Sequence, residues 1–142
     1  MKKFAMPIAL ILAIAFTICS LIFLLGASSG DVELGKKSEK KIRESLLKIT
    51  PLGTNVDDVV AAVEKKEEWE IFYVSCNSKS YYYSYWKTID FKGDRKVESI
   101  EGRIAAIQTC CLPAGNNVNV YWNFDEDEKL IDIVVEKQFV GI

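Results

Sequence analysis

The segment 118–139 constrains the fold of this chain most strongly, because it has the pattern of a β-hairpin with one apolar face. Apolar residues occupy every second position from Val118 to Phe124, as in a strand with one buried side. Asp125–Lys129 are all charged and predict a solvated loop. The expected core positions of the strand after this loop are Ile131, Ile133, Val135 and Phe139. A hairpin of this kind is not stable alone in water, so the remaining elements must cover its apolar face.

Two short amphipathic helices are expected before the strands. The first follows Ser38, places apolar residues at i, i+4 and i+7, and ends before Pro51. The second opens at a capping box formed by Thr54 and Asp57 and continues to about Glu67. The apolar positions of the two helices are Ile42, Leu46, Ile49, Val56, Val59, Val60 and Val63.

Further strands are expected at Glu70–Cys76, Tyr81–Trp86 and Ser99–Cys111. In the last of these, Gly102 and the broken alternation around Ala105 and Ala106 suggest a bulge. A Gly-Asp turn is expected within Phe91–Glu98. Helices followed by strands predict an α+β fold, in which an N-terminal membrane segment precedes two short helices packed on one face of an antiparallel sheet of three to five strands.

The first thirty residues form a separate segment. Phe4–Leu25 is uncharged and almost wholly apolar over 22 residues, so it is either a signal peptide or a membrane anchor. Its length favours an anchor, although the small residues before Gly30 also fit a cleavage site. We therefore expect a signal anchor or signal peptide over residues 1–30, a polar tether over 31–37, and one extracytoplasmic domain over 38–142.

Composition argues against several classes of function. The chain has no histidine, which removes imidazole catalysis, histidine-activated nucleophiles and most zinc sites. Residues 31–142 carry 16 of the 18 basic residues and all 20 acidic residues, a net charge of −4 without long runs of one sign. This distribution lacks the basic stripe that nucleic-acid binding needs. We expect no catalytic residue, metal site, cofactor or nucleic-acid partner.

The aromatic run Tyr81–Trp86 is the candidate partner-binding site. In an extended strand its odd-numbered residues lie on one side and its even-numbered residues on the other. Because helices are expected on one face of the sheet only, one of these rows should be exposed, and exposed aromatic rings often anchor protein interfaces. The alternative is an aromatic edge packed under the Phe91–Glu98 loop. The candidate residues are Tyr81, Tyr82, Tyr83, Tyr85 and Trp86.

Cys76, Cys110 and Cys111 are the thiols of the expected domain. In an exported protein, Cys76 at a strand end is expected to form a disulfide with one of the other two. Cys110 and Cys111 point to opposite faces of an extended strand, so only one of them is suitably placed.

Three stretches of the chain resemble the SmpA/OmlA, or BamE-like, group of small bacterial envelope lipoproteins. They are Ile49–Thr54, the helix sequence VDDVVAAV and the hairpin sequence YWNFDEDEKLIDIVVEK, and the resemblance spans about residues 40–138. It implies a periplasmic scaffold of two helices and three strands that attaches to an outer-membrane assembly or another envelope partner and has no enzymatic site.

These observations together predict a non-enzymatic, envelope-anchored adaptor. It would contact the membrane through residues 4–25 and a protein partner through its extracytoplasmic domain. The β-lactamase inhibitory proteins are similar in architecture, so the alternative is a periplasmic immunity or enzyme-inhibitor protein. Such a protein would block a basic cleft with the aromatic row and the acidic hairpin tip Asp125–Glu128.

Overall fold

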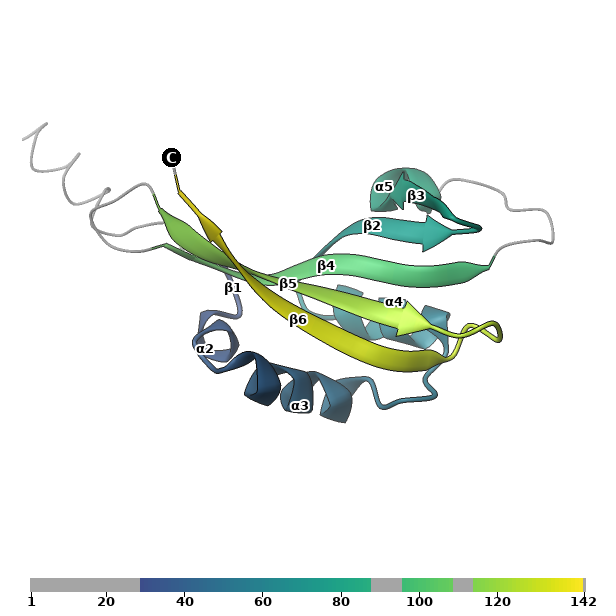
Figure 1. Ribbon diagram of the computed structural model, residues 1–142, viewed down its shortest axis with the longest axis horizontal. Coiled ribbons are helices and arrows are strands. Elements are labelled where there is room, and N and C mark those ends of the chain that lie inside the picture. The colour runs from purple at the N-terminus through teal and green to yellow at the C-terminus, as the bar shows by residue number, and fades with distance from the viewer. Residues whose placement is uncertain (1–28, 88–95, 109–113, 142) are drawn as a thin grey trace, which may run out of the picture.

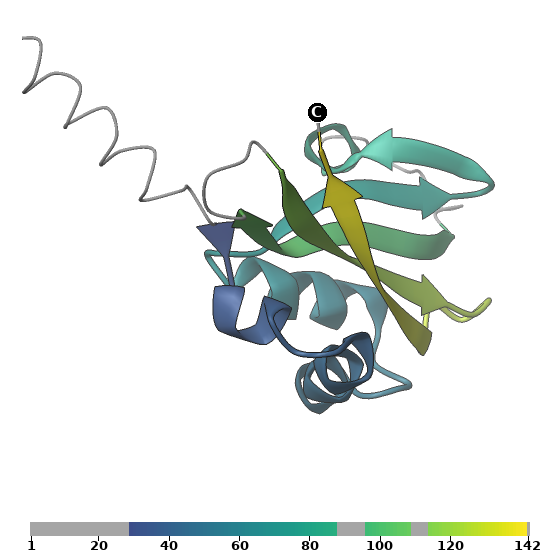
Figure 2. The same cartoon turned by 60° about the vertical axis from the view of Figure 1, so that its left-hand side comes forward.

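The computed structural model describes residues 29–87, 96–108 and 114–141 (Figure 1). Within them, one antiparallel sheet has the strand order β3-β2-β4-β5-β6, and the short β1 pairs with β4. The elements are β1 (Ser29–Gly30), α2 (Val32–Gly35), α3 (Glu39–Ile49), α4 (Val56–Glu64), β2 (Glu70–Cys76), β3 (Lys79–Tyr82), α5 (Tyr83–Trp86), β4 (Val97–Gln108), β5 (Gly115–Phe124) and β6 (Leu130–Val140). Helices α2, α3 and α4 lie on one face of the sheet (Figures 1 and 2), which confirms the α+β class.

The β5–β6 hairpin forms as its alternation predicts, with one correction in β6. The four apolar positions of β5 and Ile133 of β6 are buried. Ile131 and Phe139, expected in the core, are 53% and 67% exposed. Phe124 pairs with Leu130 while Asn123 pairs with Asp132, so Ile131 bulges out and Leu130 takes its core position. Phe139 lies near the end of β6, beyond the last buried residue of β5.

The two predicted helices form, but their ends differ from the expectation. Ser38 caps α3 by accepting a hydrogen bond from the Lys41 amide, and Ile49 is exposed at the last turn. The predicted capping box of α4 is absent, because Asn55 occupies the N-cap position and the Thr54 hydroxyl donates to the Pro51 carbonyl at 2.6 Å. The four valines of α4 are buried as predicted.

The segment 31–37, expected to be a polar tether, packs on the sheet. The Asp31 amide donates to the Ile104 carbonyl at 2.7 Å, and the Asp31 carboxylate caps α2, whose Leu34 is buried. Gly30 permits this approach, since a Cβ at its position would lie 2.4 Å from the Ile104 oxygen. Part of the segment that the sequence suggested was a free tether is therefore docked on the sheet, together with β1 before it.

Strand β4 contains the predicted bulge. Its pairing with β5 shifts between Arg103 and Ala105, and the consecutive residues Ile104 and Ala105 are both buried. The bulge lets β4 turn two neighbouring side chains toward the helices. The Gly-Asp turn expected before β4 lies outside the described residues.

The disulfide expected for Cys76 involves residues outside the described ranges. Cys76 is buried and pairs with Val97 at one end of β4. Gln108 at the other end is the last described residue before Cys110 and Cys111. The bridge from Cys76 to one of these two cysteines therefore stays a prediction.

Over the three described ranges, no helix is long and apolar enough to cross a membrane. The expected membrane segment, residues 4–25, lies outside these ranges.

Candidate interaction surface

A two-residue turn sets the register of the β2–β3 hairpin. Asn77 and Ser78 have φ of 50° and 61°, and the flanking Cys76 and Lys79 pair with each other. Two successive left-handed residues form the tight turn whose twist matches that of paired strands. This register places Tyr82, on edge strand β3, directly opposite Tyr73 on β2. The Asn-Ser sequence is the signal that points to this pairing.

The aromatic run is not one strand, because the chain turns into helix α5 at Tyr83. Residues three apart share a helix face, so Tyr83 stacks on the buried Trp86 with ring centroids 5.7 Å apart. Tyr81 is half-buried against the core, whereas Tyr82 is 66% exposed. The side chain of Tyr85 lies outside what the structure describes. The helix and the burial of Trp86 thus correct the expectation of two alternating rows, and Tyr82 is the exposed ring among the described side chains of the run.

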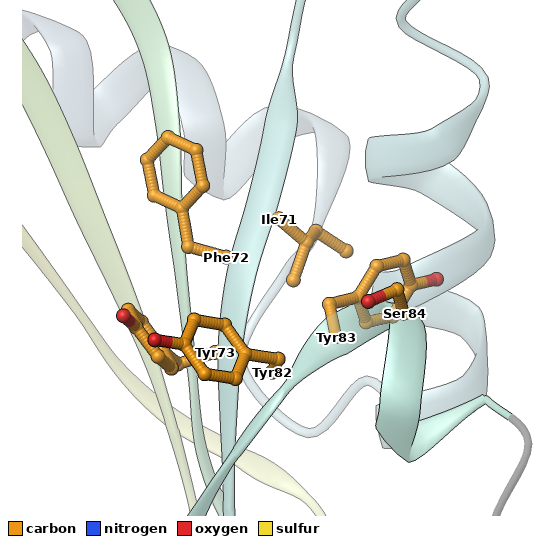
Figure 3. A pocket seen from close by; sticks show the side chains of 6 residues that line it. All are labelled: Ile71, Phe72, Tyr73, Tyr82, Tyr83 and Ser84. Atoms are coloured by element: carbon orange, nitrogen blue, oxygen red, sulfur yellow. The ribbon is translucent and has the colours of Figure 1, made fainter.

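Tyr82 forms part of a shallow groove of about 520 Å³, called here the aromatic groove. The Tyr73 and Tyr82 rings lie 4.8 Å apart and are tilted by 38°, and their hydrogen bond raises the pKa of Tyr73. Figure 3 shows this pair on one side of the groove and Tyr83 with Ser84 on the other. The lining residues are Ile71, Phe72, Tyr73, Tyr82, Tyr83 and Ser84. The sequence predicted Tyr82 and Tyr83 as binding residues, but it did not predict that residues of β2 also line the groove.

The wall of the groove formed by α5 is fixed to helix α4. The Tyr83 hydroxyl donates to the Glu64 carboxylate at 2.7 Å, and Lys87 donates to the same carboxylate. The Lys87 ammonium also lies 5.1 Å from the centre of the Tyr83 ring. The hydrogen bond from Lys87 lowers the pKa of Glu64, while burial, with help from Glu64, raises the pKa of Tyr83. Tyr83 is therefore held by contacts on both its ring and its hydroxyl.

The wall formed by β2 is supported from β4. The Arg103 guanidinium lies 5.2 Å from the centre of the Phe72 ring and forms an ion pair with Glu70 at 2.5 Å. The pairing of β2 with β4 shifts between Ile71 and Tyr73, so Phe72 sits at a bulge. The bulge brings three consecutive side chains of β2 to one groove.

The helix-free face of the sheet continues from the groove as a polar surface. Tyr73 pairs with Glu101, which pairs with Tyr121, so the groove and these residues lie on one row across the sheet. The Tyr121 hydroxyl lies 3.5 Å from Glu101 and 3.4 Å from Glu136. Partial burial, followed by these two carboxylates, raises the pKa of Tyr121. Polar groups therefore follow the aromatic groove along this row, which ends at the exposed Val134 paired with Tyr121.

The chemistry that this site offers is contact by aromatic rings. Its polar atoms are phenol hydroxyls and the Ser84 hydroxyl, beside rings that present apolar surface. Among the described residues, no group of three or more His, Cys, Asp or Glu is placed to hold a metal ion. No family model, curated protein or solved structure matches the chain.

Proposed function

We propose that this chain is a non-enzymatic adaptor of the cell envelope. Phe4–Leu25 holds it in the membrane, its domain lies on the extracytoplasmic side, and the aromatic groove binds a protein partner. This role agrees with the one implied by the resemblance to SmpA/OmlA proteins. The single observation that supports it most is the exposed ring of Tyr82, packed against Tyr73 in a groove with fixed walls.

Preorganisation is what makes this groove suited to a protein partner. An exposed tyrosine provides a large contact area with few rotatable bonds, so ordering it on binding costs little entropy. Tyr73 packs against the Tyr82 ring, and Tyr83 on the opposite wall is held by Glu64 and Lys87. A partner therefore meets rings that are already in place.

The acidic hairpin tip makes an inhibitor the weaker of the two proposals. The Asp125 carboxylate accepts hydrogen bonds from the amides of Asp127 and Lys129 at 2.9 Å, and Glu128 accepts one from the Val97 amide at 2.8 Å. Two of the four acids thus bond to backbone within the domain. The tip joins β5 to β6, while the groove lies on β2, β3 and α5. A single basic cleft would have to reach both.

Tyr82→Ser tests the proposal. Because Tyr82 is exposed and loses only its cross-strand contact with Tyr73, the free energy of unfolding should fall by at most about 1 kcal/mol. Capture of the partner by the full chain from detergent-solubilised membranes should weaken by about 2 kcal/mol or more, as expected for an anchoring ring. Ile131→Ser is the matched control, since it also replaces an exposed apolar residue but lies on β6 at the opposite edge of the sheet.

Thermal unfolding and capture are measured on the same preparations. If Tyr82→Ser lowers the free energy of unfolding by more than about 1 kcal/mol and capture falls with it, the ring has a structural role and the interface is misplaced. If Tyr82→Ser and Ile131→Ser capture equally well, the partner does not use the groove.

A further inference from the structure

One row of paired residues runs across the sheet from β1 to the C-terminal part of β6. Ser29 pairs with Ala106, Ala106 with Asn117, and Asn117 with Gln138. The next row outward contains Phe139, and the one after it contains Val140. Both side chains are large, apolar and exposed, at 67% and 47%. The exposed end of β6 is thus level with the point where the chain joins the sheet.

Strand β1 runs inward from the same end of the sheet. Strand β1 is antiparallel to β4, and its pairing steps from Ala106 to Ala105 as the chain runs from Ser29 to Gly30. It therefore runs inward from the end at which Phe139 and Val140 lie. Figures 1 and 2 show the C-terminal end of β6 and β1 toward this end of the sheet.

The apolar N-terminal run stops close to this point. Leu25 precedes Ser29 by four residues, which extend over at most about 14 Å. Phe139 and Val140 project about 3 to 7 Å beyond the row of Ser29. The polar layer between water and hydrocarbon in a bilayer is about 5 to 7 Å thick on each side. An anchor at residues 4–25 thus leaves these two side chains within reach of the membrane surface.

We propose that Phe139 and Val140 insert into the interface of the bilayer that holds residues 4–25, and so fix the domain on the membrane by a second contact. This inference rests on the proposed anchor. The lipid surface explains two exposed apolar side chains at the tip of an edge strand, and it orients the strands away from the membrane. The row through Tyr73, Glu101 and Tyr121 then stands about 13 Å above that of Ser29, which leaves the aromatic groove in water.

Tryptophan fluorescence tests this contact in the full chain. Phe139→Trp and Ile131→Trp each replace an exposed apolar residue of β6, at opposite ends of the strand. Each protein is reconstituted into phosphatidylcholine vesicles with plain or brominated acyl chains, which quench nearby indoles. The three native tryptophans are buried in the domain, so the wild-type chain supplies the background. Phe139→Trp should lose emission in brominated vesicles beyond this background, and Ile131→Trp should not.

Flotation of the same samples separates the two proposals. If the chain does not float with the vesicles, residues 4–25 do not anchor it, and the proposed contact of Phe139 and Val140 with the bilayer is refuted as well. If the chain floats but the two variants are quenched equally, the anchor stands and the inference is wrong. A blue shift of Phe139→Trp emission without quenching by brominated lipid means that another copy of the chain covers this end, which also overturns the inference.

Discussion

Gly30 and Gly53 have almost the same left-handed backbone conformation, with φ of +84° and +85°, but different surroundings. A Cβ at Gly30 would meet the Ile104 carbonyl of β4, whereas nothing lies within 4 Å of one at Gly53. Both positions therefore require a residue that tolerates a left-handed backbone. Of the two, Gly30 also lies close to another strand. Substitution at the two positions separates these effects.

Gly53→Ala should destabilise the domain by about 1 kcal/mol, since a left-handed conformation costs an L-residue about that much. Gly30→Ala should cost at least about 1 kcal/mol more, because β1 must also move away from β4. Chemical denaturation of the full chain in detergent measures the difference. Equal losses in the two variants would show that β1 does not pack on β4 as described.

The hydroxyl of Tyr83 predicts sensitivity to alkaline pH. Its pKa is raised above the ordinary value of 10.0 in the folded protein, so the folded state keeps a proton that the unfolded chain releases. Its contribution to stability is complete below pH 10 and is lost as the pH rises above it. Tyr83→Phe should lower the free energy of unfolding by about 1 kcal/mol at neutral pH. Above pH 10 the variant should lose less stability than the wild type, because it has no hydroxyl to ionise at this position. Unfolding midpoints at several pH values test this, and profiles of the same slope would contradict it.

At the scale of elements, helix α3 protects the free edge of β6. Arg43 donates from Nε to the Ile133 carbonyl at 2.8 Å and from a second nitrogen to the Asp132 carboxylate at 2.6 Å. Glu39 accepts a hydrogen bond from the Lys137 amide at 3.2 Å. The bond from Arg43 lowers the pKa of Asp132. Outward backbone groups on an edge strand are sites of pairing between molecules, and these two side chains occupy some of them.

Replacing Glu39 and Arg43 together by alanine should increase self-association of the full chain in detergent, because it exposes the edge of β6. Glu44 and Lys48 lie exposed on the same helix, and their double replacement by alanine removes the same charges. Sedimentation velocity should show larger species for the first pair and a distribution like the wild type for the second. An unchanged distribution for both pairs would mean that α3 does not guard this edge.

The sequence predicts elements well where one periodicity acts alone. The alternation in β5 and the valines of α4 identify both elements and their buried faces. Prediction fails where packing overrides the local pattern: burial of Trp86 turns an aromatic run into α5, and a bulge turns Ile131 outward. Docking of β1 depends on contact with β4, far along the chain, and no local pattern shows it.

At the scale of the whole molecule, the candidate site was predicted only in part. The run Tyr81–Trp86 lies at the edge of the sheet that carries the groove, and its Tyr82 is exposed, but Trp86 of the same expected row is buried. The contribution of Phe72 and Tyr73 depends on the register of β2 with β3 and on a bulge against β4. These pairings are long-range properties of the sheet. The partner-binding role itself stays a prediction.

The most direct test of the central proposal is photocrosslinking in intact cells, with the photoreactive residue p-benzoylphenylalanine placed at position 82 of the full chain. Position 131, exposed on the opposite edge of the sheet, carries the same residue as the control. If the aromatic groove binds a protein partner, position 82 should give one discrete adduct in the membrane fraction and position 131 should give none. The absence of an adduct at position 82, or the same adduct at both positions, would contradict the proposal.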